Sequence, residues 1–196
     1  AGCAGCRLAT SGRLRRFRYQ WEVPVDLYRD RISILNGEGL MSTTPHTHNV
    51  VLIGMPGAGK STLGVLLAKW TSRHFIDTDV VIQARERRTL QTIIDTEGLA
   101  AFRHVEERAI LDLRCDNSVI ATGGSVVYSD AAMQHLRALG IVVYLQLDLP
   151  HLQERLHNLP SRGVVMTPGQ TLAQLFAERT PLYARYADTC LSLIHI

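Results

Sequence analysis

The sequence predicts an α/β protein, a three-layer α/β/α sandwich around a parallel five-stranded sheet whose last strand we expect to be truncated. Two observations support this fold class. A glycine-rich loop, residues 54–61, stands between an apolar run and a helical pattern, so it joins a buried strand to a helix. After it, short apolar runs alternate with helical segments as far as residue 186. This alternation is typical of parallel strands that helices cover on both faces.

The expected strands are short runs of apolar residues, long enough to cross a buried sheet. In chain order they are residues 50–53, 74–77, 118–121 and 141–147. The expected helices show apolar residues at helical spacing; the first carries Leu63, Leu66, Leu67 and Trp70 on one face. Gly98 and Gly140 end two of them. In order the helices are residues 61–70, 80–88, 89–96, 99–114, 129–139, 152–157 and 171–186, with a Gly/Pro-bearing loop at 158–169.

Gly54-x-x-x-x-Gly59-Lys60-Ser61 is the phosphate-binding loop (P-loop) pattern in its expected place between strand and helix. Its glycines let backbone N–H groups close around a phosphate, and the helix N-terminus adds partial positive charge. We expect Lys60 to reach the outer phosphates and the Ser61 hydroxyl to bind Mg²⁺. The alternative is a glycine-rich turn before a lysine. The loop predicts a nucleoside triphosphate site made of Gly57, Ala58, Gly59, Lys60, Ser61 and Thr62.

Further polar residues follow the second and third strands, where a parallel sheet gathers its ligands. Asp77-Thr-Asp79 provides carboxylates that can hold Mg²⁺ or accept a proton from an attacking hydroxyl. Capping of the next helix by Asp79 is the alternative. Gly123-Gly124 either lets a substrate pack against bare backbone or forms a simple turn.

Three arginines are individually weak candidates for binding a substrate anion. Arg103 lies on the long helix, where pairing with Glu106 or Glu107 on a solvated face is the alternative. Arg162 lies in the Gly/Pro-bearing loop, and Arg179 precedes a Thr-Pro-Leu-Tyr segment.

The two ends of the chain differ from the rest. Residues 1–40 hold seven arginines against four acids and so carry the entire net charge of +3. Because Met41 is the first methionine, we expect residues 1–40 to be upstream sequence read in frame, with a transit peptide as the alternative. Residues 191–196 match what the end of a sequencing adapter encodes, so we expect the natural chain to be truncated and the P-loop domain to occupy residues 41–190. A short C-terminal strand is the alternative.

Composition excludes several function classes. The basic character lies in residues 1–40 alone, so it gives no case for nucleic-acid binding. No run approaches about 18 apolar residues, so we expect no membrane span. The eight histidines show no metal-binding spacing, and Cys115 is the one cysteine away from the two ends. We expect a monomeric, cytoplasmic protein.

Together these features resemble the shikimate kinases over nearly all of residues 48–190. One P-loop is common to many enzymes, but six matches in the family's order are a specific signal. The matches are residues 54–62, Asp77-x-Asp79, Phe102-Arg103 with Glu106-Glu107, Gly123-Gly124, Arg155 with Arg162, and Arg179-Thr-Pro-Leu-Tyr183.

The resemblance implies a step of aromatic amino-acid biosynthesis: transfer of the γ-phosphoryl group of ATP, with Mg²⁺, to a ring hydroxyl of shikimate, an acceptor that bears a carboxylate and hydroxyls. It implies catalytic roles for Lys60, for Asp77 near the Mg²⁺ held by Ser61, and for Asp79, which orients the attacking hydroxyl. Arg103 and Arg179 clamp the carboxylate with planar guanidinium forks. Gly123 and Gly124 line the ring, and Arg155 lies over the adenine. Arg162 is also catalytic: it closes with a mobile lid that excludes water, and it neutralises charge on the transferring group.

Two departures from the family pattern keep alternatives open. Arg162 is followed by Gly163-Val-Val-Met166, where the family usually has Pro-Leu-Leu, and Ser125 stands in place of a third glycine. Glycine in place of proline loosens the lid backbone. One alternative is therefore a kinase of the same fold acting on another hydroxy acid or polyol. A nucleotide-binding regulatory module without turnover is the other.

Overall fold

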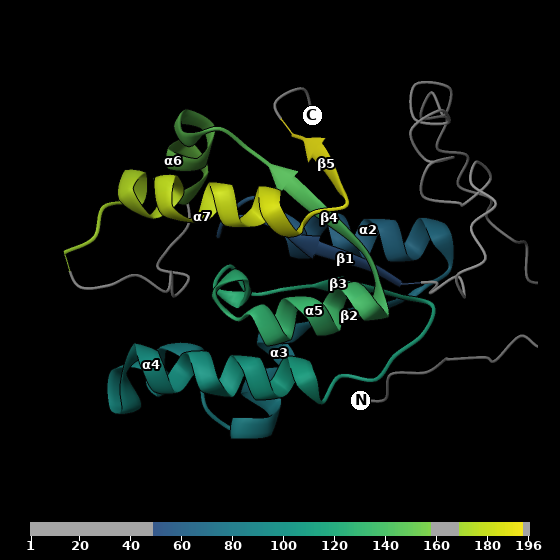
Figure 1. Cartoon of the computed structure of the whole chain (residues 1–196), viewed down its shortest axis with the longest axis horizontal. Coiled ribbons are helices and arrows are strands. Elements are labelled where there is room, and N and C mark those ends of the chain that lie inside the picture. Colours follow the sequence, from purple (N-terminus) through teal and green to yellow (C-terminus); the bar gives the residue numbers. More distant parts are fainter. Residues whose placement is uncertain (1–48, 158–168, 194–196) are drawn as a thin grey trace, which may run out of the picture. The chain divides into compact units, whose positions relative to one another are not determined.

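The computed structural model describes residues 49–157 and 169–193, and in them it confirms the predicted fold class. Five parallel strands form one sheet in the order β2-β3-β1-β4-β5 (Figure 1). They are β1 (Asn49–Ile53), β2 (His74–Asp77), β3 (Ser118–Ala121), β4 (Gly140–Gln146) and β5 (Thr189–Ser192). The helices are α2 (Lys60–Thr71), α3 (Thr78–Glu86), α4 (Leu90–Leu111), the 3₁₀ turn η1 (Val126–Tyr128), α5 (Asp130–Leu139), α6 (Leu149–His157) and α7 (Leu172–Tyr186).

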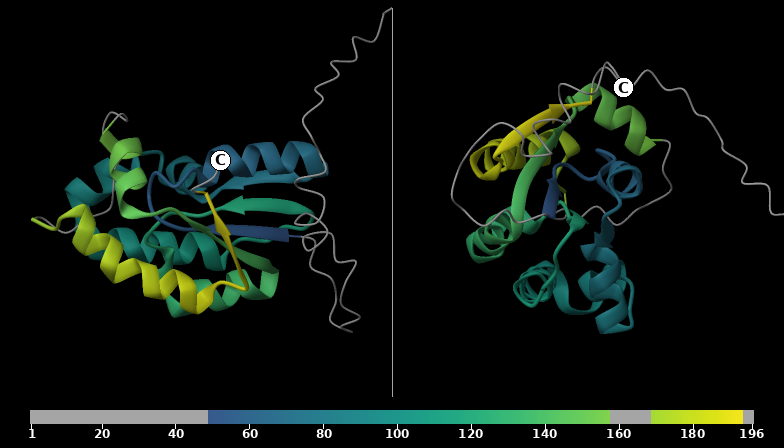
Figure 2. Two further views of the ribbon diagram at one scale, coloured as in Figure 1. Left: turned by 90° about the horizontal axis from the view of Figure 1, so that it is seen from above. Right: turned by 90° about the vertical axis from the view of Figure 1, so that its right-hand side faces the viewer.

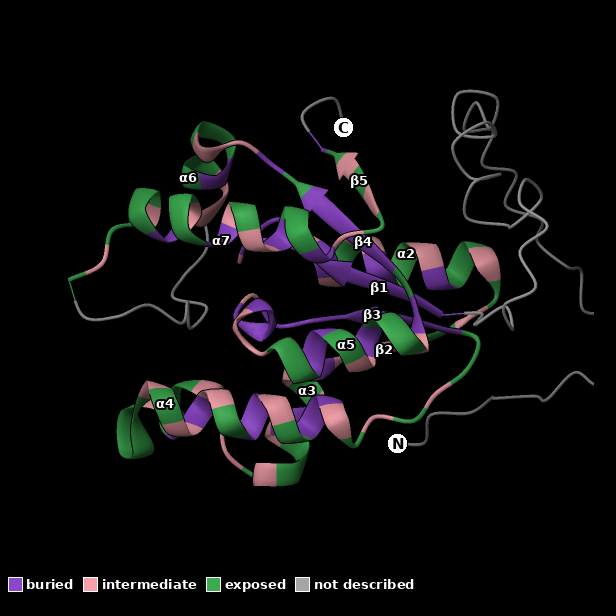
Figure 3. Cartoon of the chain, viewed as in Figure 1, coloured by how far each residue is buried: buried purple, intermediate pink, exposed green. Residues whose placement is uncertain are grey.

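Helices cover both faces of the sheet. Figure 2 shows α2 on one face and α5 with α7 on the other. Helices α3 and α4 pack against each other beyond the β2 edge. The central strands β1 and β3 are buried along their whole length (Figure 3), as continuous apolar runs in a parallel sheet require, whereas the edge strands β2 and β5 are partly exposed.

Helix α2 packs through a different face from the one its leucines indicate. Leu66 and Trp70 are exposed, Trp70 by 66%, while Gly64 and Ala68 lie buried. A Cβ at position 64 would come within 2.6 Å of the Phe75 ring. The apolar face expected from Leu63, Leu66, Leu67 and Trp70 is therefore wrong for Leu66 and Trp70, because small residues let α2 approach the sheet closely.

Most element ends are shifted slightly from the expected positions, and two differences are larger. The helices expected at 89–96 and 99–114 form the single element α4, which is interrupted at Gly98, where φ is 84° and ψ is 168°. At the other end of the described chain, Leu191 and Ser192 pair with Leu145 and Gln146 of β4. These two residues of the expected non-natural tail are therefore part of the fifth strand in this structure.

Candidate active site

The P-loop runs from the end of β1 into α2, as the sequence predicts. Gly59 precedes the helix with φ 96°, a left-handed conformation that disfavours side chains larger than glycine's. Inside the loop, the backbone N–H of Ala58 donates to the carbonyl of Met55 at 3.1 Å. The Lys60 ammonium folds back and donates to the carbonyls of Gly54 at 2.8 Å and Met55 at 2.9 Å. A bound phosphate would compete with these two carbonyls for the ammonium.

Burial lowers the pKa of Lys60 to about 8, and the nearby Asp79 carboxylate opposes this shift. The ammonium form therefore predominates at neutral pH, since the pKa stays above 7. A buried, positively charged donor that is held by replaceable carbonyls is suited to phosphate oxygens.

Ser61 and Asp77 lie side by side at the start of α2 and the end of β2. The Ser61 hydroxyl donates to Asp77 Oδ2 at 2.7 Å. The other oxygen, Oδ1, accepts the backbone N–H of Asp79 at 3.0 Å and thus caps α3. Asp77 and not Asp79 is the helix cap, so the capping alternative is wrong for Asp79. A hydroxyl and a carboxylate are hard oxygen ligands of the kind that Mg²⁺ prefers, so this pair fits the ion.

A cavity of about 250 Å³ opens at the carboxyl ends of β1, β2 and β3, beside the P-loop. At its floor, a Cβ added to Gly123 would overlap Glu106 Oε1 and would lie 2.9 Å from Asp79 Oδ1. Glycine at 123 is therefore required, because two carboxylates meet there. Many of the predicted site residues line this cavity: Gly57, Gly59–Thr62, Asp79, Gly123–Gly124 and Arg179. Glu106, which was not predicted as a site residue, lines it too.

Glu106 is the more deeply buried of these two acids, with 2% of the residue exposed. The Ser125 hydroxyl donates to its Oε2 at 2.6 Å, while its Oε1 accepts no hydrogen bond from the described residues. Burial raises the pKa of Glu106 to about 7, although the Ser125 hydrogen bond acts in the opposite direction. Burial and the neighbouring Asp77 carboxylate likewise raise the pKa of Asp79.

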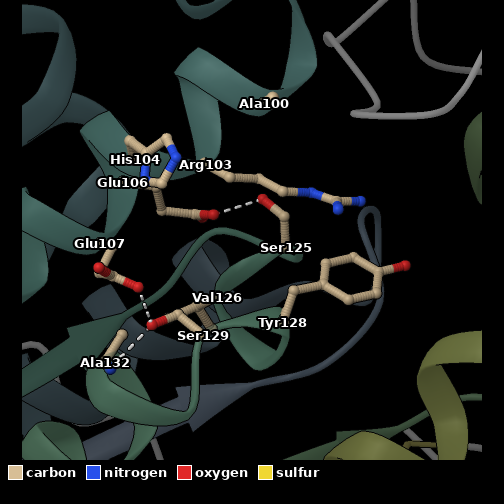
Figure 4. Close-up of a pocket in the computed structure, with 10 residues that line it drawn as sticks. All are labelled: Ala100, Arg103, His104, Glu106, Glu107, Ser125, Val126, Tyr128, Ser129 and Ala132. Carbon is tan, nitrogen blue, oxygen red and sulfur yellow. Dashed lines mark hydrogen bonds between the residues drawn. The ribbon is translucent and has the colours of Figure 1, made fainter.

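The two expected carboxylate-binding arginines approach the site from different helices. Arg179 on α7 is 1% exposed and lines the cavity, and a Cβ at Gly124 would lie 3.2 Å from its Nη1. Arg103 on α4 lines an adjoining cavity, also of about 250 Å³, which Figure 4 shows. Its guanidinium lies over the Tyr128 ring, 4.1 Å from the centroid.

The described residues contain no ion pair between Arg103 and the two acids one turn further along α4. Glu106 accepts from Ser125 and Glu107 from Ser129, as the dashed lines of Figure 4 show. The solvated-face alternative for Arg103 is therefore wrong.

Known proteins are similar to this chain in sequence and in fold. A protein-family model described as shikimate kinase matches residues 56–193. The shikimate kinases of Thiobacillus denitrificans and Pseudomonas aeruginosa (strain LESB58) are 41% and 42% identical to this chain over 143 residues, which is 71% of this chain and 78% and 83% of theirs. A solved structure, the shikimate kinase from Acinetobacter baumannii in complex with shikimate, matches with a TM-score of 0.68 and 32% identity over 73% of this chain and 82% of that one.

This chain belongs to the shikimate kinase family. The expected enzyme class, an ATP-dependent small-molecule kinase, is thereby confirmed. No helix in the described ranges of this kinase is both long and apolar enough to cross a bilayer.

Most of the predicted site residues of this kinase meet at one edge of the sheet. Arg155 on α6 donates from Nη1 to the carbonyl of Ala58 at 3.3 Å, so it lies at the P-loop. Arg103 opens instead to the adjoining cavity, which shares Glu106 and Ser125 with the first one. The expected lid residues, Arg162 and Gly163–Met166, lie outside the described residues.

Sequence reasoning did not predict three residues that line these cavities as members of the candidate site: Glu106, Ser125 and Tyr128. A signal for Glu106 was present, because it shares the buried face of α4 with Phe102, Val105 and Ala109. An acid on the apolar face of a helix is seldom left without a function or a partner. For Ser125 and Tyr128 the sequence holds no comparable signal, since their partners are distant in the chain.

Proposed function

We propose that this chain transfers the γ-phosphoryl group of ATP to a ring hydroxyl of shikimate. One observation carries the proposal. A single cavity holds the P-loop lysine Lys60, a half-buried carboxylate at Asp79 and a buried arginine at Arg179. Those groups match the three parts of the reaction: the transferred phosphoryl group, the attacking hydroxyl and the acceptor carboxylate. Family membership supports the choice of acceptor.

Asp79 is the residue we assign to the attacking hydroxyl. Its Oδ1 lies against the bare backbone of Gly123, so a ring packed on that glycine would bring a hydroxyl to the carboxylate. Its raised pKa brings this carboxylate closer to the range in which it accepts a proton efficiently. Lys60, within electrostatic reach, favours the ionised form that must accept the hydrogen bond.

We assign the nucleotide to the P-loop, with Lys60 at the outer phosphates and Arg155 beside the loop. Ser61 and Asp77 would hold Mg²⁺, which supplies charge neutralisation on the phosphates when it is bound. The loop backbone would orient the phosphates, and Lys60 would exchange its hydrogen bonds to Gly54 and Met55 for phosphate oxygens.

We assign the acceptor carboxylate to Arg179, and to Arg103, which contacts the same Tyr128 ring from another helix. Hydrogen bonds between charged groups contribute roughly 1.5–3 kcal/mol each. Arg179→Ala should therefore raise the KM for shikimate about ten- to a hundredfold and leave the KM for ATP unchanged. Arg185→Ala is the matched control, because Arg185 lies on the same helix but stacks on Tyr186 instead. Equal effects of both changes would contradict the assignment.

The deciding experiment measures ADP release by the purified chain with ATP, Mg²⁺ and each member of a panel of hydroxy acids and polyols. Shikimate-dependent ADP release, with shikimate 3-phosphate as the product, is the expected result. ADP release that depends on a different acceptor would support the alternative kinase, which the Gly163–Met166 segment favours. ATP binding without turnover on any acceptor would overturn the proposal.

A further inference from the structure

Tyr128 lies where two arginines from different helices meet. It is the last residue of η1, at the rim of the cavity shown in Figure 4. Arg103 Cζ lies 4.1 Å and Arg179 Cζ 5.1 Å from the centroid of its ring. The negative face of an aromatic ring attracts a guanidinium, and here one ring serves two cations that would otherwise repel each other.

The Tyr128 hydroxyl also fixes the orientation of the Arg179 guanidinium through hydrogen bonds. It donates its proton to Glu178 Oε1 at 2.7 Å and accepts from Arg179 Nε at 3.1 Å. Because the proton is engaged by Glu178, a lone pair of the oxygen is left to face Arg179. Burial raises the pKa of Tyr128, so the hydroxyl keeps its proton at neutral pH. Glu178, Tyr128 and Arg179 thus form an ordered chain of hydrogen bonds.

Stacking holds Arg103 without consuming its hydrogen bonds. In the described residues, the buried Nε of Arg103 has no hydrogen-bond partner. A guanidinium that lies on a ring presents its N–H edge sideways, where a planar carboxylate can accept two parallel hydrogen bonds. An ion pair with Glu106 or Glu107 would instead have neutralised this edge.

We propose that Tyr128 is a positioning residue that sets the spacing and orientation of Arg103 and Arg179 for the carboxylate of the acceptor. This inference rests on the proposed function, since it assigns the two arginines to an acceptor carboxylate. Tyr128 acts through them: the ring orients Arg103, and the hydroxyl orients Arg179.

Two substitutions separate the ring from the hydroxyl. Tyr128→Phe keeps the ring on Arg103 and removes the hydrogen bond to Arg179, so we expect the KM for shikimate to rise about three- to tenfold. Tyr128→Leu removes both contacts and should raise it about ten- to a hundredfold. In both variants kcat at saturating shikimate and the KM for ATP should stay within about twofold of wild type, because Tyr128 is assigned to neither the reacting hydroxyl nor the nucleotide.

Tyr186→Phe is the matched control. Tyr186 also donates its hydroxyl to a carboxylate, Asp130 Oδ1 at 2.8 Å, and also lies against an arginine, Arg185 at 5.2 Å. It is not among the residues that line either cavity. Removal of the Tyr186 hydroxyl should change the free energy of unfolding about as much as Tyr128→Phe does. It should leave the KM for shikimate unchanged.

A binding comparison by calorimetry tests whether Tyr128 acts on the carboxylate. The ligands are shikimate and its analogue in which the carboxylate is reduced to a hydroxymethyl group. We expect Tyr128→Leu to weaken the binding of shikimate at least fivefold more than that of the analogue. Equal weakening of both would show that Tyr128 shapes the pocket as a whole, and would overturn the inference. Wild-type-like KM values in both Tyr128 variants would also overturn it, while the proposed function would stand. Absence of shikimate turnover in the wild type would overturn both.

Discussion

Lys60 and Glu106 are buried side chains of opposite charge, and burial shifts their pKa values in opposite directions. It lowers the pKa of Lys60 to about 8 and raises the pKa of Glu106 to about 7. Near neutral pH the lysine is therefore mostly charged, whereas Glu106 is close to the midpoint of its titration. The charged Lys60 is suited to bind phosphate, and the titration of Glu106 makes the site sensitive to pH.

Lys60→Met should leave a folded protein whose phosphoryl transfer is about 10²- to 10³-fold slower, as is typical when one preorganised charged donor is removed. Turnover is measured as kcat for shikimate-dependent ADP release, and folding by circular dichroism. Lys69→Met is the control, because Lys69 is exposed and lies in the last turn of the same helix. Near-normal turnover of the Lys60 variant would remove the P-loop assignment.

Glu106 should make stability fall as pH rises. Its pKa is raised in the folded state from 4.5 to about 7, so the folded state binds the extra proton between these values. The contribution is fully present below about pH 4.5 and is lost as pH rises through about 7. Between pH 5 and 8 the free energy of unfolding should therefore drop by on the order of 2 kcal/mol from this group.

Glu106→Gln should abolish that pH-dependent loss in urea denaturation at pH 5 and pH 8. Glu107→Gln is the control, because Glu107 also accepts from a serine but is only half-buried. Ser125→Ala should raise the pKa of Glu106 further, since the Ser125 hydroxyl stabilises the carboxylate. An unchanged pH dependence in the Glu106 variant would contradict the assigned titration.

At the scale of elements, helix α4 lines the cavity beside the P-loop with residues from both sides of a break in the helix. Leu90, before the break at Gly98, and Phe102 and Glu106, after it, line the same cavity. The backbone of Gly98 combines φ 84° with ψ 168°, a region that is almost exclusive to glycine. The break therefore depends on this residue and is not a consequence of crowding, since a Cβ at position 98 would meet no atom within 4 Å.

Gly98→Ala should accordingly destabilise the protein by roughly 1–3 kcal/mol through backbone strain alone. Urea denaturation measures the loss, and the KM for shikimate should rise if the two halves of α4 realign. Arg108→Ala, at an exposed position of the same helix, is the control. A Gly98 variant as stable as wild type would mean that the helix tolerates another path at this point.

For the whole molecule, the compact α/β unit should not depend on residues 1–40. The family match begins at residue 56, and the leading segment has a high positive charge and no clear apolar periodicity. Deletion of residues 1–40 should leave the Tm and the affinity for ATP unchanged. Differential scanning calorimetry and ATP titration make the comparison. A drop of several degrees in Tm would show that this segment contributes to the fold.

The sequence by itself determined the α/β class, the P-loop, four of the strands and most residues of the candidate site. These features follow local rules: apolar runs mark buried strands, and the P-loop motif needs its glycines, lysine and serine at fixed spacing. The boundaries of β2 and β3 were predicted to the residue for the same reason.

Only the tertiary structure decided which face α2 buries, that Asp77 and not Asp79 caps α3, and how Glu106, Ser125 and Tyr128 enter the site. The decisive contacts join distant parts of the chain: Ser125 lies 19 residues from Glu106, and Tyr128 lies 51 from Arg179. Periodicity and motif spacing report the neighbours of a residue along its own element. They carry no information on which side chains the packing of separate elements brings together, and that packing sets burial, charge and hydrogen bonding in this site.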